Sequence, residues 1–408
     1  MTTHEPGGRS APLPDRDHED LHPEGRHHDD PSPQVRVSGA RQLLALLPRL
    51  LGYHPDHSVV LVLTETSTTP GAPSSPARVV MSCRLDVPTV QELPALSAQL
   101  APVLRRAVDG TPGIRLMHAF GHDLDEGPDG RPRPDLVAAL HLALLRLADE
   151  AGAHLHDLLL VRDEGRSLLP VVADGEPVHP VPGWTGSPDP RDVPATADLV
   201  LRGRGALRSR TELVSLVRRR DPEAGRATAV ALAVQDVGGP PPDVNEGLTL
   251  LTACVLQGHR PTPAERARIT RVLRRRWARD ALLARWLPEL FPAHDLEGPG
   301  QVGDLVRRLP VWRPEEAAPA LDRLLALVPQ VPLEECAPLL TVTAMMAWGS
   351  GEGSIANETC AFALEVDPGY VMAQLLDRAL QHGLRPPRVH RSAGAASPGA
   401  SPDRRPAA

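Results

Sequence analysis

The stretch from Ser38 to Thr64 constrains the fold of this chain more than any other part of its sequence. Leucines recur at helical spacing between Leu43 and Leu51, and Gly52 and Pro55 follow soon after. Glycine tolerates the left-handed conformation that ends many helices, and proline keeps the helix from resuming. Residues 59–63 are all valine or leucine, which is typical of a strand covered on both faces. The stretch therefore predicts a buried helix that leads into a buried strand.

Alternating helix and strand patterns continue through the N-terminal half. We expect strands at residues 78–87, 114–120, 157–161 and 167–172, and helices at residues 89–108 and 134–151. This order is that of a mixed sheet with crossover helices. Right-handed crossovers place the strands 78–87, 114–120 and 157–161 parallel, with strand 59–63 antiparallel beside strand 78–87.

From about residue 194 the pattern becomes helical. We expect helices at residues 209–220, 223–236, 246–257, 263–287, 315–328, 333–347, 354–366 and 369–382. The helix 263–287 is the best marked, because Thr262, Pro263 and Glu265 form a capping box and Pro288 stops it. The chain thus divides into a disordered acidic tail (1–34), a mixed α/β domain (35–193), an all-α domain (194–385) and a disordered tail (386–408).

Composition narrows the function classes. The 408 residues carry a net charge of −7, which argues against a protein that binds nucleic acid over most of its surface. Four widely spaced cysteines indicate neither a zinc knuckle nor a disulfide framework. The polar N-terminus and the lack of any run near ~20 apolar residues predict a cytoplasmic protein without a membrane partner.

Polar side chains lie just before the predicted strand 59–63 and just after several of the other predicted strands. The expected topology brings them to one sheet edge, where open α/β sheets usually bind ligands; they are Asp56, His57, Ser58, Asp86, His122, Asp123 and Asp163. These residue types suit a metal site or a hydrolytic triad, but either site needs its members in direct contact. Turn formation and backbone capping are the alternative roles. We therefore assign neither a metal ligand nor a cofactor.

Phosphate-binding glycine loops are absent from the sequence, since neither of the two glycine-rich phosphate motifs occurs and the chain has no lysine. The segment 202–205 is only a weak anion-binding signal. An arginine-rich helix face can contact phosphate, RNA or an acidic partner, and its candidates are Arg271, Arg274, Arg275 and Arg279. A solvated face is the alternative, because no nucleic-acid-binding module accompanies these residues.

Two segments carry a family resemblance. The run LLGYHPDHSVVLVL at residues 50–63 resembles the opening signature of an uncharacterised actinobacterial family, domain of unknown function 4192. The run that starts AWGSGEGSIANETC at Ala347 is similar to the closing segment of that family. The resemblance implies a shared architecture and a bacterial cytoplasmic origin, and it implies no activity. Within the closing run, Ala356, Ala363 and Pro368 have the spacing of a tetratricopeptide repeat, so we expect a helical hairpin of that kind.

The leading functional hypothesis is a non-enzymatic binding or regulatory protein. It would hold a protein partner through the helical domain, and the α/β sheet edge would be available to a small ligand. A metal-assisted hydrolase at that edge is the first alternative. Arginine-mediated binding of nucleic acid is the second.

Overall fold

The computed structural model describes residues 36–37, 39–66, 77–108, 113–127, 132–180, 183–201, 205–296, 302–313, 316–384 and 386. Three sequence predictions lie outside these ranges. They are the acidic tail 1–34, nearly all of the tail 386–408, and residues 202–204 of the weak anion-binding segment.

The N-terminal half is built on one mixed sheet. Its strands are β1 (Arg36–Val37), β2 (Ser58–Thr66), β3 (Ala77–Asp86), β4 (Ile114–His122), β5 (His154–Arg162), β6 (Ser167–Ala173), β7 (Glu176–Pro177) and β8 (Thr185–Gly186). The order is β1-β3-β2-β4-β5-β6-β7, with β8 paired to β6. Strand β2 is antiparallel to both β3 and β4, and β4 is parallel to β5. These directions are the ones that the sequence predicted.

Helix α1 (Ala40–Leu51) and strand β2 fold as their sequences indicate. The helix ends at Gly52, whose φ of 81° is the left-handed conformation that glycine adopts without steric cost. Residues 58–64 of β2 are all buried, because helices cover both faces of the sheet at this strand. Successive side chains alternate between the faces, so Leu61 packs beneath the covering helices on one side and Val60 packs toward α1 on the other.

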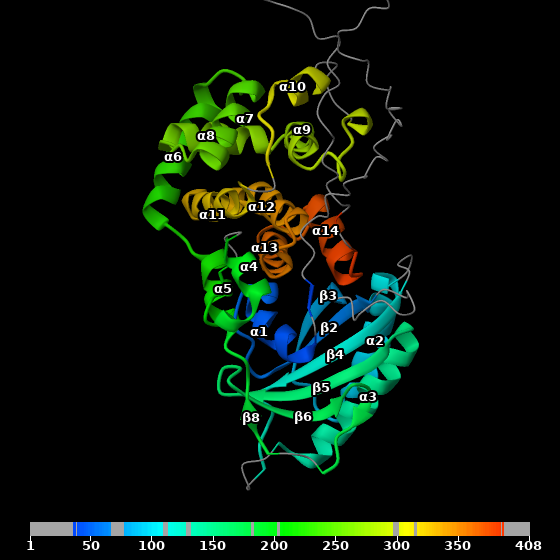
Figure 1. Cartoon of the computed structure of the whole chain (residues 1–408). Helices are drawn as coiled ribbons and strands as arrows, with labels where there is room; N and C mark the ends of the chain where they lie inside the picture. The colour runs from blue at the N-terminus through cyan, green and yellow to red at the C-terminus, as the bar shows by residue number, and fades with distance from the viewer. Residues whose placement is uncertain are drawn as a thin grey trace, which may run out of the picture. The chain divides into compact units, whose positions relative to one another are not determined.

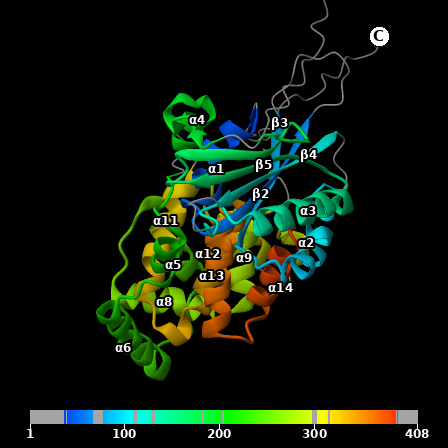
Figure 2. The same cartoon turned by 90° about the horizontal axis from the view of Figure 1, so that it is seen from below.

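Helices α2 (Leu93–Val108) and α3 (Pro134–Ala151) cover the face of the sheet opposite α1 (Figures 1 and 2). The core on the α1 face also includes Leu199 of α4 (Pro194–Leu201) and Leu213 of α5 (Arg210–Arg218). Both residues come from beyond position 193. The start of the helical half therefore completes a core of the sheet, and the division into two domains at this point stays a prediction.

The C-terminal half is helical, as predicted. Its remaining helices are α6 (Pro222–Gly238), α7 (Val244–Thr252), α8 (Pro263–Leu273), α9 (Arg276–Trp286), α10 (Val302–Arg308), α11 (Ala317–Leu327), α12 (Ala337–Gly349), α13 (Gly353–Val366) and α14 (Val371–Gln381). Helices α7 to α9 and α11 to α14 share a large apolar core that includes Trp286 and Trp312, and Leu305 of α10 packs against it. Helices α12 and α13 are consecutive and pack together, while their likeness to a tetratricopeptide hairpin stays a prediction. No helix in the described ranges is long and apolar enough to cross a bilayer.

The prediction of one helix over residues 263–287 was wrong. The capping box at Thr262 and Glu265 is present, but the chain breaks between α8 and α9, where Arg275 has an extended backbone. No glycine or proline marks the break. Arg274 is held there by Glu335 and Asp236, so contacts with other parts of the chain outweigh local helix propensity.

Candidate functional site

The start of β2 and the ends of β3 and β4 lie together at one end of the strands, which is the sheet edge that the sequence predicted as a ligand site. Ser58 pairs with Asp86 of β3 on one side and with His122 of β4 on the other. His122 in turn pairs with Val161, one residue before the end of β5. The remaining predicted residues flank these strand ends, and they are Asp56, His57, Asp123 and Asp163.

These edge residues do not form one site, because they are divided between the two faces of the sheet. His57 and Asp123 line a pocket of about 300 Å³ together with Arg162 and Trp184. The neighbouring His122 does not line this pocket, since its side chain points to the opposite face. Within the described ranges, no three His, Cys, Asp or Glu side chains come together in a way that would hold a metal ion. A small ligand at this edge stays a prediction.

The pocket is flanked by tight turns, and its lining includes the acidic residues Asp123, Asp125 and Glu126. His57, Asp123 and Asp163 have φ values of 37°, 47° and 56°, which side chains other than glycine adopt at some cost. Burial raises the pKa of Asp123; the charge of His57 opposes this rise, and the carboxylates of Asp56 and Asp163 add to it. Arg162 stacks over the Trp184 ring, with its Cζ 4.2 Å from the ring centroid. Its guanidinium also pairs with Asp163 at 3.5 Å, so it is already engaged.

Ser58 and His122 are buried on the α1 face, with 0% and 3% of their surfaces exposed. Neither Ser58 Oγ nor His122 Nε2 has a hydrogen-bond partner within the described part of the chain. Burial lowers the pKa of His122 to about 3, with a smaller contribution from the charge of His54. The imidazole is therefore neutral at physiological pH.

The buried imidazole of His122 predicts a loss of stability in mild acid. The unfolded chain binds a proton at His122 near pH 6.5, whereas the folded chain stays neutral down to about pH 3. Stability from this group is complete above pH 6.5 and falls as the pH drops through that window. We expect the free energy of unfolding, measured with urea, to fall between pH 7 and pH 5 in the parent. In a His122→Gln variant this fall should be smaller by roughly 2 kcal/mol. Equal losses in both proteins would contradict the neutral state of His122.

A second buried polar group lies on the same face and was missed by the sequence analysis. His118 Nδ1 lies 2.6 Å from Asp157 Oδ2, and His118 Nε2 lies 3.0 Å from Thr64 Oγ1. The order of the three side chains is that of a hydrolytic triad. All three are buried, and none lines the pocket beside His57 and Asp123. We interpret them as a satisfied polar network inside the core.

Three of the four candidate anion-contacting arginines are engaged with other side chains. Arg271 and Arg274 both pair with Asp236, and Arg274 also pairs with Glu335. Arg279 is 5% exposed and donates to Asp280 and to the Tyr370 hydroxyl. Because α8 and α9 are separate helices, these arginines do not form one helix face.

A cleft of about 1020 Å³ lies between the sheet and the last helices. Strand β3 borders it on one side, with residues of α2 and α1 beside the strand. Helices α13 and α14 border it on the other side. Its lining includes Arg84 and Asp86 of β3, Arg210 of α5 and Glu358 of α13, so Asp86 is the one predicted edge residue that belongs to this cleft.

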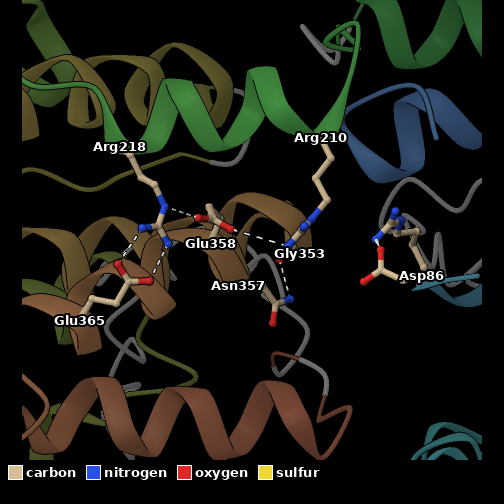
Figure 3. Close-up of polar contacts among 8 residues, drawn as sticks. Asp86, Arg210, Arg218, Gly353, Asn357, Glu358 and Glu365 are labelled. Atoms are coloured by element: carbon tan, nitrogen blue, oxygen red, sulfur yellow. Dashed lines mark hydrogen bonds and ion pairs between the residues drawn. The ribbon is translucent and has the colours of Figure 1, made fainter. Parts of the chain in front are cut away.

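An ion-pair network beside the cleft holds α13 to α5 (Figure 3). Arg218 Nε donates to Glu358 Oε1 at 2.7 Å, and its two terminal nitrogens donate to Glu365 at 2.6 and 2.7 Å. The guanidinium also lies over the Phe362 ring, 5.3 Å from the centroid. At the other end of α5, Arg210 lies 4.0 Å from Glu358. The network fixes the helical wall of the cleft relative to α5.

Comparison with known proteins gives a family and nothing more specific. Residues 41–387 match the model of a family described as domain of unknown function (DUF4192). The match covers most of the chain, so the chain belongs to this family, as the resemblance at its two ends implied. No curated protein and no solved structure matches the chain.

Proposed function

We propose that this member of the DUF4192 family is a non-enzymatic binding protein whose cleft between β3 and α13–α14 takes a polypeptide segment of a protein partner. The observation that carries the proposal is the cleft itself. Its volume of about 1020 Å³ is at the upper limit of small-molecule pockets, and it is long enough to run beside nine consecutive residues, 80–88.

The walls of the cleft support the same proposal. They combine apolar side chains such as Leu96 and Leu384 with hydrogen-bonding groups such as Asn357 and Gln99. A surface of this mixed kind is typical of protein interfaces, where apolar contacts supply affinity and polar groups supply orientation. The tetratricopeptide-like spacing in α13 also favours a protein partner, because repeats of that kind present binding surfaces to other chains.

Site-specific photocrosslinking tests the proposal in the native host. A photoreactive residue at Gln99 of α2 or at Asn357 of α13 is expected to capture the same polypeptide from both walls of the cleft. A photoreactive residue at Glu223 of α6, which is exposed and outside the cleft, is the control and should not capture it. Identical products from all three positions would contradict the proposal.

A purified-component measurement then separates specific binding from incidental capture. The captured polypeptide should bind the full chain saturably, and an Ala95→Trp variant that fills the cleft should weaken binding at least tenfold. Ala138→Trp is the matched control, because Ala138 is also exposed but lies on α3 outside the cleft. Equal affinity for both variants would show that the cleft is not the binding site.

A further inference from the structure

We propose that the partner segment enters the cleft as an added β-strand that pairs with the free edge of β3 and presents basic side chains. This inference rests on the proposed function and adds the mode of binding and the chemistry of the segment. Strand addition to an open sheet edge is a recurring mode of peptide recognition, in which main-chain hydrogen bonds supply affinity.

The first observation is that most of the outer edge of β3 has no strand beside it. Strand β1 pairs only with Ala77 and Arg78, and within the described residues no other strand pairs with that side of β3. The segment from Val79 to Asp86 is paired on its inner side with β2. Among the residues that the structure describes, its outward N–H and C=O groups therefore have no strand to pair with and can bond to another chain.

The second observation is that this same edge faces the cleft. Every residue from Val80 to Pro88 lines the cleft without interruption. Side chains of a strand alternate between the two faces of its sheet, so a surface that touched one face would be lined by every second residue. Consecutive lining residues show that the cleft runs along the edge of β3. A segment lying there would continue the row of pairs that β1 begins.

The third observation concerns the charged side chains of the cleft that have no oppositely charged partner. The charges of its two arginines are balanced by carboxylates. Arg84 pairs with Asp86, and Arg210 belongs to the network in which two arginines face the two carboxylates of Glu358 and Glu365. Two further acids line the cleft on opposite walls, Glu92 before α2 and Asp377 in α14.

Each of these two acids is bonded to uncharged groups. Glu92 accepts from the Thr89 backbone N–H and hydroxyl at 2.9 and 2.8 Å, and Asp377 accepts from the Gln381 amide at 2.6 Å. In the described part of the chain, neither carboxylate has an ion pair with a basic side chain. The uncompensated charge of the cleft is negative, which favours lysine or arginine side chains on the added strand.

Binding of a synthetic peptide tests this inference. The probe is a fluorescein-labelled decapeptide of alternating valine and arginine with an amidated end, titrated with the full chain and followed by fluorescence anisotropy. Two further peptides carry N-methyl groups, one on every valine nitrogen and the other on every arginine nitrogen. An added strand bonds to its neighbour through the N–H groups of every second residue. We therefore expect one methylated peptide to lose at least tenfold in affinity and the other to stay within about threefold of the parent.

Charge is tested separately. Replacing arginine by glutamate in the probe should weaken binding at least tenfold, and Asp377→Asn should weaken binding of the arginine probe severalfold. Asp149→Asn, at an exposed position of α3 outside the cleft, should leave affinity unchanged.

The outcomes separate this inference from the proposed function. Equal affinity of the two methylated peptides, or no binding of the parent peptide, would overturn strand addition. Crosslinks from Gln99 and Asn357 to a partner would still support the cleft as a binding site in that case. Occupation of the β3 edge by another segment of this chain or by a second copy would also overturn the assignment to a partner.

Discussion

A Leu140→Ala variant is expected to unfold with a free energy lower than that of the parent by about 2–5 kcal/mol. Leu140 lies on the inner side of α3 with 3% of its surface exposed, and it packs into the core between α2, α3 and the sheet. Truncation removes apolar contacts and leaves a cavity that the surrounding helices fill only in part. Chemical denaturation monitored by circular dichroism measures the loss.

The matched control lies two residues away on the same helix. Leu142 is 56% exposed, so Leu142→Ala should change the free energy of unfolding by no more than about 0.5 kcal/mol. Both substitutions remove the same atoms and alter helix propensity equally. A similar loss in the two variants would show that α3 does not cover the sheet through the face that contains Leu140.

Arg218→Met is expected to lower the free energy of unfolding by roughly 2–3 kcal/mol. The methionine can keep contact with the Phe362 ring, but it removes the three donors to Glu358 and Glu365. The side chain of Glu358 is 10% exposed, so its carboxylate would be left largely buried with only a distant cation. Leaving a buried charge without its donor is the main cause of the expected loss.

Arg210→Met provides the control on the same helix. Arg210 is 52% exposed and lies 4.0 Å from Glu358, so its removal should cost no more than about 1 kcal/mol. The pH dependence gives a second readout. Hydrogen bonds from Arg218 lower the pKa of Glu365 below its ordinary value of 4.5, so stability from this pair is lost as the pH falls below that value. Arg218→Met should weaken this acid dependence, and an unchanged dependence would contradict the contact.

Local sequence signals were sufficient for most of the helices and strands. Gly52 ends α1 and the aliphatic run of β2 is buried on both faces, because backbone conformation and apolar pattern at these positions agree with the tertiary structure. The break at Arg275 was not predictable, since it depends on contacts of Arg274 with Asp236 and Glu335, which are distant in sequence.

The candidate site was less predictable than the fold. The predicted topology correctly placed the strand ends together. Because side chains alternate between the two faces of a sheet, however, His122 points to the face opposite the pocket that Asp123 lines. His118 and Asp157 are 39 positions apart and meet only because β4 and β5 pair in that register. The cleft depends on how α13 and α14 pack beside β3, which no local pattern encodes.

Amide hydrogen exchange along β3 tests the central claim most directly. With the valine–arginine decapeptide bound, we expect exchange to slow at alternate residues between Val79 and Asp86, because only every second N–H points toward the added strand. Strand β6 lies near the opposite end of the strand order, so its amides should exchange at the same rate with and without peptide. Protection confined to α13 and α14, with β3 unchanged, would contradict the claim that the partner segment binds by extending the sheet.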